Sequence, residues 1–201
     1  MSAAILNFRA TAGFVTDNSG QTYVLASDTY PTSRIGLTFG WETPTLIDSR
    51  DRNSSVDPRL AGLHFRPNGG GTDTFRLDLS SGEYDIAFAF GDSDNDEEHY
   101  IDVKDNTSSL FSFSPLSTPT ARWGDAAGNT WSASEWPTNN VAVRKTISSG
   151  ILRVVVSAIT GARSTTIANL SVTQVGEAPA MSAYIKPNKM RPRIFAPGLA
   201  R

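Results

Sequence analysis

The feature that most constrains this chain is a run of alternating apolar and polar residues on both sides of a turn. The segment TFRLDLSSGEYDIAFAF, residues 74–90, keeps this alternation before and after Ser80-Ser81-Gly82. A period of two places the apolar side chains of a strand on one face, and a Ser-Ser-Gly sequence favours a turn. The segment therefore predicts a β-hairpin. Its predicted buried face comprises Phe75, Leu77, Leu79, Tyr84, Ile86, Phe88 and Phe90.

The same pattern recurs along the chain. Residues 99–113 and 141–159 predict two further hairpins, the second around Ser148-Ser149-Gly150, and residues 165–175 predict a closing strand. Charged residues make up 19% of the chain, below the usual quarter, and no segment has the period of an amphipathic helix. Short strands between regular turns predict an all-β fold, a jelly-roll β-sandwich over residues 1–176. Residues 42–72 and 115–140 lack the alternation, and we expect long loops there.

Composition excludes several classes of protein. The chain has no cysteine, so neither a disulfide nor a thiolate metal site can form. The net charge of −2 argues against nucleic-acid binding by the whole molecule, and no run of 18 apolar residues predicts a membrane span. The first residues show neither a basic region nor an apolar core of a signal peptide. We therefore expect synthesis in a cytoplasm, without a signal peptide.

The C-terminal segment, residues 177–201, differs from the rest. Four prolines oppose both a helix and a central strand, and residues 178–201 carry five basic residues and no acid. The rest of the chain is acidic, with 13 basic and 20 acidic residues. We expect an extended arm that binds a partner, either another copy of the chain or a different protein. The residues predicted to bind it are Tyr184, Lys186, Lys189, Arg191, Arg193, Phe195, Leu199 and Arg201.

The segment FAFGDSDNDEEHY, residues 88–100, offers a first function, that of a GDSL-type esterase with Ser93 as nucleophile. Such an enzyme requires a histidine base in an Asp-x-x-His sequence near the end of the chain. His64 and His99 are the two histidines, and neither stands in that context. The predicted all-β pattern also differs from the α/β fold of those hydrolases. The sequence therefore predicts a protein that is not an enzyme.

The same segment offers a second function, the binding of calcium. Asp92, Asp94 and Asp96 alternate, which suits oxygen ligands in a tight loop. The EF-hand pattern fails, because the sixth position is Glu97 and the twelfth is Val103. The alternative is a solvated acidic turn at a strand end, with no cofactor.

Two sets of residues are candidates for sugar binding. Trp123, Trp131 and Trp136 form a platform if their rings are exposed, or a small core at one end of the sandwich if they are not. Arg50 and Arg52 are suited to a carboxylated sugar, because guanidinium groups pair with carboxylates. The alternative for the arginines is an internal salt-bridge network that fixes the long loop. Its other members are Asp51, Asp57 and Arg59.

The first hundred residues resemble a known module. The resemblance runs through Asn7-Phe8, residues 30–41 from Tyr to Trp, Arg50-Asp51-Arg52 and Gly91-Asp92, in that order. The chain is similar here to the galactose-binding-like sandwich at the front of rhamnogalacturonan lyase and acetylesterase-type proteins, and more distantly to malectin-type domains. The resemblance implies a jelly-roll sandwich in which Gly91-Asp92 ends a strand. In those enzymes a catalytic domain follows the module, whereas here the basic arm follows it.

Two functions agree with these features. The first is a virion structural protein, such as a bacteriophage capsid decoration protein present in many copies and docked by its C-terminal arm. The ending RPRIFAPGLAR, residues 191–201, is similar to short Pro/Arg endings of phage-encoded proteins. The alternative is a stand-alone carbohydrate-binding module. The partners expected are other copies of the chain, a capsid or other virion protein, or a glycan, and not nucleic acid or a membrane.

Overall fold

Two large β-sheets packed face to face form the body of the protein. The computed structural model describes residues 3–12, 21–52, 57–161 and 163–176. The first sheet has the order β12(Thr130–Ser132), β11(Arg122–Gly124), β8(Gly82–Asp92), β16(Asn169–Gln174), β1(Ala3–Arg9) and β2(Gln21–Leu25), with β13(Val143–Ile147) also paired to β8. The second has the order β10(Ser108–Thr118), β9(Glu97–Asp105), β14(Ile151–Ala158), β7(Gly71–Asp78), β4(Leu37–Trp41) and β3(Thr32–Arg34). The all-β, jelly-roll β-sandwich is therefore confirmed.

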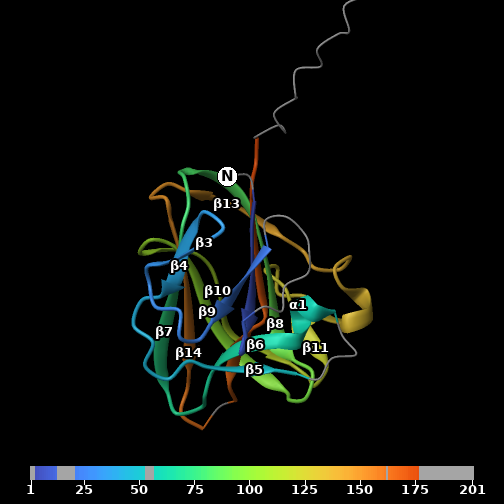
Figure 1. Ribbon diagram of the computed structural model, residues 1–201. Helices are drawn as coiled ribbons and strands as arrows, with labels where there is room; N and C mark the ends of the chain where they lie inside the picture. The colour runs from blue at the N-terminus through green and yellow to red at the C-terminus, as the bar shows by residue number, and fades with distance from the viewer. Residues whose placement is uncertain (1–2, 13–20, 53–56, 162, 177–201) are drawn as a thin grey trace, which may run out of the picture.

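A small third sheet closes one end of the sandwich. It contains β15(Thr165–Ile167), β6(Gly62–Arg66) and β5(Asp48–Asp51), and the one-turn helix α1(Pro58–Ala61) precedes β6. In Figure 1, β5 and β6 cross the lower end of the molecule, opposite the end marked N. The long loop predicted over residues 42–72 is therefore wrong in part. All five residues of β6 are buried, so this strand has no alternating pattern to reveal it.

The second predicted loop also contains regular structure. Residues 115–140 include the end of β10, the short strands β11 and β12, and the 3-10 helix Ala133–Glu135. These elements are only three residues long apart from β10, which is too short for a periodic pattern to be read.

Most predicted strands form, but two of the three predicted hairpins do not. β9 and β10 pair as a hairpin, with Asp105 opposite Ser108. In contrast, β7 pairs with β4 and β14, whereas β8 pairs with β11, β13 and β16 in the other sheet. The turn at residues 80–82 thus carries the chain from one sheet to the other, as does the turn at residues 148–150.

These two crossovers have a common physical reason. Alternation fixes which face of a strand is buried, and both inner faces of a sandwich bury their side chains in one core. A crossover and a hairpin therefore share the same pattern of apolar residues. The two crossover turns lie side by side, because the Leu79 N–H donates to the Gly150 carbonyl over 2.9 Å.

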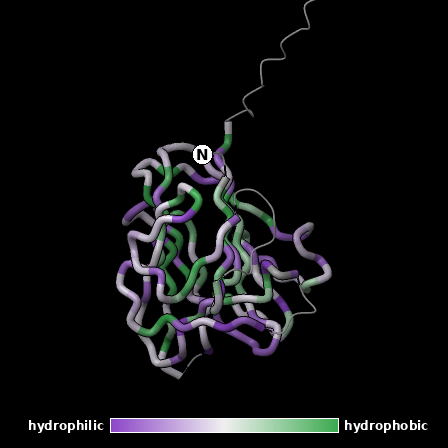
Figure 2. Tube along the Cα trace, viewed as in Figure 1, coloured by the Kyte–Doolittle hydropathy of each residue, from purple (hydrophilic) through white to green (hydrophobic). Residues whose placement is uncertain are grey.

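The main core lies between the two large sheets. Phe8, Phe75 and Trp41 pack edge to face near its centre, with Phe8 and Phe75 centroids 5.2 Å apart. The predicted buried face of residues 75–90 is confirmed, apart from Leu79, which is half-buried. Figure 2 shows the apolar segments in green along these inner strands. Within the described residues, no helix is both long and apolar enough to cross a membrane.

Gly91 allows β11 to lie against the end of β8. Its φ of 141° is one that side chains rarely adopt, and an added Cβ would lie 2.3 Å from the carbonyl oxygen of Arg122. Trp123 lies opposite Gly91 in the antiparallel pairing. The Gly-Asp sequence is therefore explained by the close approach of two strands, and the resemblance correctly placed it at a strand end.

We expect Gly91→Ala to destabilise the protein by more than about 2 kcal/mol, because the new methyl group must displace backbone. Gly161→Ala is the matched control. Gly161 has a φ of 85° with open space around it, so this variant carries only the conformational cost of about 1 kcal/mol. Urea denaturation of both variants measures the difference, and equal destabilisation would contradict the steric account.

Candidate functional site

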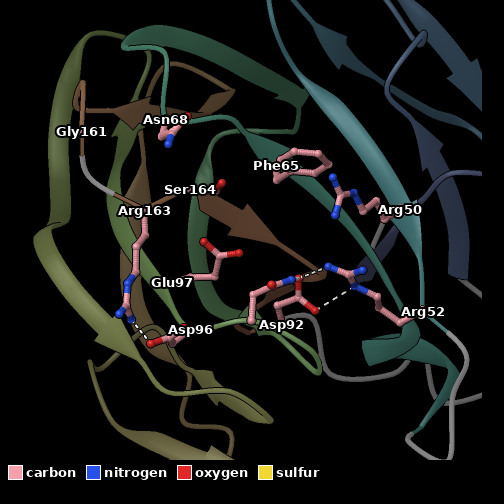
Figure 3. Close-up of a pocket in the computed structure, with 11 residues that line it drawn as sticks. Arg50, Arg52, Phe65, Asn68, Asp92, Asp96, Glu97, Gly161, Arg163 and Ser164 are labelled. Carbon is pink, nitrogen blue, oxygen red and sulfur yellow. Dashed lines mark hydrogen bonds and ion pairs between the residues drawn. The ribbon is translucent and has the colours of Figure 1, made fainter.

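A polar hollow of about 380 Å³ opens between the small third sheet and the turn that joins β8 to β9. Its walls come from four separate parts of the chain, as Figure 3 shows. This volume is in the range of small-ligand sites. The residues that line it are Arg50, Arg52, Phe65, Asn68, Asp92, Asn95, Asp96, Glu97, Gly161, Arg163 and Ser164.

An ion pair between Arg52 and Asp92 forms the base of this pocket. Arg52 Nε donates to Asp92 Oδ1 over 2.8 Å, and a second bond joins Arg52 Nη2 to Asp92 Oδ2. Asp92 is the last residue of β8 and is only 2% exposed. Burial acts to raise the pKa of its carboxyl, but bonds from Arg52, Asn95 and the backbone N–H of Asp94 outweigh it and lower the pKa. Both Asp92 oxygens are thus engaged inside the protein.

Arg50 lies beside this pair and has a different environment. It is two residues before Arg52, so both side chains lie on the same face of the β5 segment. Its guanidinium carbon lies 4.8 Å from the centroid of the Phe65 ring, which is a cation–π contact. No carboxylate among the described residues forms an ion pair with Arg50. It is an exposed cation held in place on an aromatic ring.

Glu97 is the functional candidate that the sequence patterns did not identify. It begins β9, is 6% exposed and faces the hollow. Burial, and then the negative charge of Asp92, raise the pKa of its carboxyl to about 7, although the Ser164 backbone N–H and Arg52 act in the opposite direction. Its place in the alternation of β9, on the same face as buried His99 and Ile101, was the available signal.

The predicted calcium ligands point to different partners. Asp96 forms an ion pair with Arg163, and Asp94 lies 3.4 Å from Arg52 Nη1. Asp92 is held by Arg52 as described. No group of three metal-ligating residues occurs in the part of the chain that the structure describes. Calcium binding stays a prediction that no observation tests.

The esterase hypothesis fails on geometry as well as on sequence. Ser93 Oγ donates to Asp94 Oδ1 over 2.8 Å. His99 is fully buried, with Nε2 2.8 Å from Thr118 Oγ1 and Nδ1 accepting from the Thr166 N–H. His64 accepts from the Trp41 indole and contacts the Arg9 carbonyl. Both imidazoles are thus fully engaged elsewhere, and neither pairs with Ser93.

The predicted tryptophan platform is wrong for two of its three members. Trp123 and Trp131 are 0% and 1% exposed and stack with centroids 6.1 Å apart. Trp136 is half-buried and packs on Trp131 at 5.1 Å. Together with Leu60 they belong to a second apolar cluster beside the main core. Their burial supports the alternative of a small core and leaves no ring face free for stacking on a sugar.

The arginine-rich loop forms separate pairs instead of one network. Asp51 pairs with Arg9, with 2.8 Å between Asp51 Oδ1 and Arg9 Nε. Asp57 pairs with Arg59, and its carboxylate also accepts from the Arg59 N–H at the start of α1. These pairs fix the loop, as the alternative proposed, but Arg50 takes no part in them. The predicted arm, residues 177–201, with all of its partner-binding residues, lies outside the described residues.

We expect Arg52→Ala to destabilise the protein by about 3–5 kcal/mol, because it leaves the buried Asp92 carboxylate without its cation. Arg144→Ala is the control. Arg144 forms an equally bidentate pair with Asp85, but both side chains are exposed, so little change is expected. Urea denaturation near pH 7 measures both, and a small loss for Arg52→Ala would contradict the structural role of the pair.

We expect both histidines to remain uncharged at pH 5. Burial lowers the pKa of His64 to about 4 and that of His99 to about 3, from an ordinary 6.5. The unfolded chain therefore binds protons that the folded chain does not, and both residues reduce stability as pH falls from 6.5 towards 4. Imidazole chemical shifts in a heteronuclear NMR titration test this, and a midpoint near 6.5 for either ring would contradict it.

Comparison with known proteins supports the fold. No protein-family model and no curated protein match this chain. Protein YXIM from Bacillus subtilis matches with a TM-score of 0.55 and 14% identity, over 88% of this chain and 41% of that one. A family 35 carbohydrate binding module from Clostridium thermocellum matches with a TM-score of 0.37 and 12% identity, over 68% of this chain and 91% of that one.

A CBM35 from Paenibacillus barcinonensis matches with a TM-score of 0.38 and 14% identity, over 69% of this chain and 93% of that one. The chain thus spans about two fifths of the length of the Bacillus protein. These matches give no support to the predicted virion role. At such low identity the match to YXIM shows the fold alone: this chain shares the β-sandwich architecture of that larger protein.

Proposed function

We propose that this domain is a carbohydrate-binding module, and that a sugar carrying a carboxylate binds in the pocket between the third sheet and the β8–β9 turn. The observation that carries the proposal is Arg50, which lies exposed on the Phe65 ring without an acidic partner in the described chain. This proposal takes up the alternative from the sequence in place of the virion role.

The polar groups of the pocket suit a ligand rich in hydroxyl groups. Asn68 and Asn95 each contribute an amide that both donates and accepts, and Ser164 contributes a hydroxyl. Phe65 adds an aromatic ring to an otherwise polar wall. A sugar presents the matching mixture of hydroxyl groups and apolar C–H faces.

The charges of the pocket favour an acidic sugar over a neutral one. Arg52 and Arg163 are paired with Asp92 and Asp96, whereas Arg50 has no such partner in the described residues. A guanidinium group binds a carboxylate through two parallel N–H bonds, which adds geometric specificity to charge. The contact with Phe65 restricts the Arg50 side chain before the ligand arrives, so less entropy is lost on binding.

The same arrangement favours binding over cleavage. Glycoside hydrolysis requires two carboxyl groups that act on opposite sides of the scissile bond. Both oxygens of Asp92 are engaged by protein donors, and Asp96 is held by Arg163. Glu97 is thus the one pocket carboxyl without a side-chain partner in the described chain.

We expect D-galacturonate or D-glucuronate to bind more tightly than D-galactose at pH 6, as measured by isothermal titration calorimetry. Arg50→Ala should weaken binding of the acidic sugar at least tenfold, because it removes the unpaired cation. Arg144→Ala is the matched control, since it removes an exposed arginine on β13, which does not line the pocket. Equal affinity for the neutral sugar, or no effect of Arg50→Ala, would contradict the proposal.

A further inference from the structure

Glu97 is set apart from the other acids of the pocket by its surroundings. Its side chain is buried in the wall at the start of β9, and its carboxyl group points into the hollow in Figure 3. Asp92 and Asp96 each have an arginine partner, but no side chain in the described part of the protein pairs with Glu97. The donor it has is the backbone N–H of Ser164.

The charged groups that face Glu97 come from every element around the pocket. Asp92, at the end of β8, and Asp96, in the turn, disfavour its ionised form. Arg52, which follows β5, favours that form, and Arg163 and Arg50 complete the set of cations. Three arginines thus face two aspartates. The lining has a net charge of +1 when Glu97 is protonated and 0 when it is ionised.

We propose that Glu97 is the specificity-determining acid of this pocket: uncharged, it donates a hydrogen bond to the bound acidic sugar, and charged, it repels that sugar. The inference rests on the proposed function and adds a regulation to it. The pocket takes up a carboxylated sugar in mildly acidic solution and releases it in mildly alkaline solution.

The chemistry of the two forms supports this role. A protonated carboxyl has one O–H donor, whereas an ionised carboxylate only accepts. In the ionised form, Glu97 would place a second negative charge beside the ligand in a partly buried site, where repulsion is screened less than in water. Burial and Asp92 place the change between the two forms near pH 7.

Other groups do not mask this change between pH 6 and pH 8. The carboxyl group of the sugar is already ionised throughout this interval, because ordinary carboxyl groups titrate near pH 4. Burial holds the pKa values of His64 and His99 at about 4 and about 3, so both imidazoles stay neutral. A difference in affinity across this interval therefore reports on Glu97.

The test is the affinity for D-galacturonate at pH 6 and pH 8, measured by calorimetry on the full chain. We expect the wild-type dissociation constant to rise about tenfold or more at pH 8. Glu97→Gln, which stays uncharged and keeps a donor, should bind with similar affinity at both pH values. Glu98→Gln is the matched control, because Glu98 points to the opposite face of β9 and does not line the pocket.

The outcomes separate this inference from the proposed function. Wild-type binding that is equally tight at pH 6 and pH 8 overturns the role of Glu97 and leaves the sugar site standing. No binding at either pH overturns both. A ¹³C NMR titration of the Glu97 carboxyl in the free protein needs no variant and no ligand. A midpoint near the ordinary value of 4.5 would overturn the inference even if Glu97→Gln fails to fold.

Discussion

The site depends on one bidentate ion pair, between Arg52 and Asp92. Arg52 follows the edge of the small third sheet, and Asp92 ends β8 in a large sheet, so the pair joins two layers that share few other polar contacts. Because Asp92 is almost fully buried, its charge is tolerated only with this partner and the N–H donors of the turn. The same pair therefore sets the path of the β8–β9 turn, and with it the positions of Asp96 and Glu97.

The electrostatics of the pocket follow from which charges this pair neutralises. Arg52 with Asp92, and Arg163 with Asp96, leave Arg50 and Glu97 as the groups that respond to a ligand. Elsewhere in the domain, burial keeps His64 and His99 uncharged and occupied by hydrogen bonds. Titratable chemistry near neutral pH is thus concentrated at one position of the described chain, on the wall of the hollow.

The sequence predicted faces of strands better than it predicted their neighbours. Alternation identified Phe75 and Phe88 as buried, but it could not show that their strands lie in different sheets, because a crossover and a hairpin leave the same pattern. It missed β6, in which every residue is buried. Arg50 was identified from its residue type, whereas Glu97 acquires its properties from burial beside Asp92, which only the folded chain creates.

The pocket is assembled from segments that are far apart in the sequence, whereas the main core lies between the large sheets and shares none of the pocket's residues. Residues such as Asn68, Asn95 and Arg163 line the hollow from exposed loops and the turn. Substitutions there alter the ligand-facing surface without creating a cavity in the core. This separation allows relatives of the domain to diversify in what they recognise, while the sandwich that presents the site stays the same.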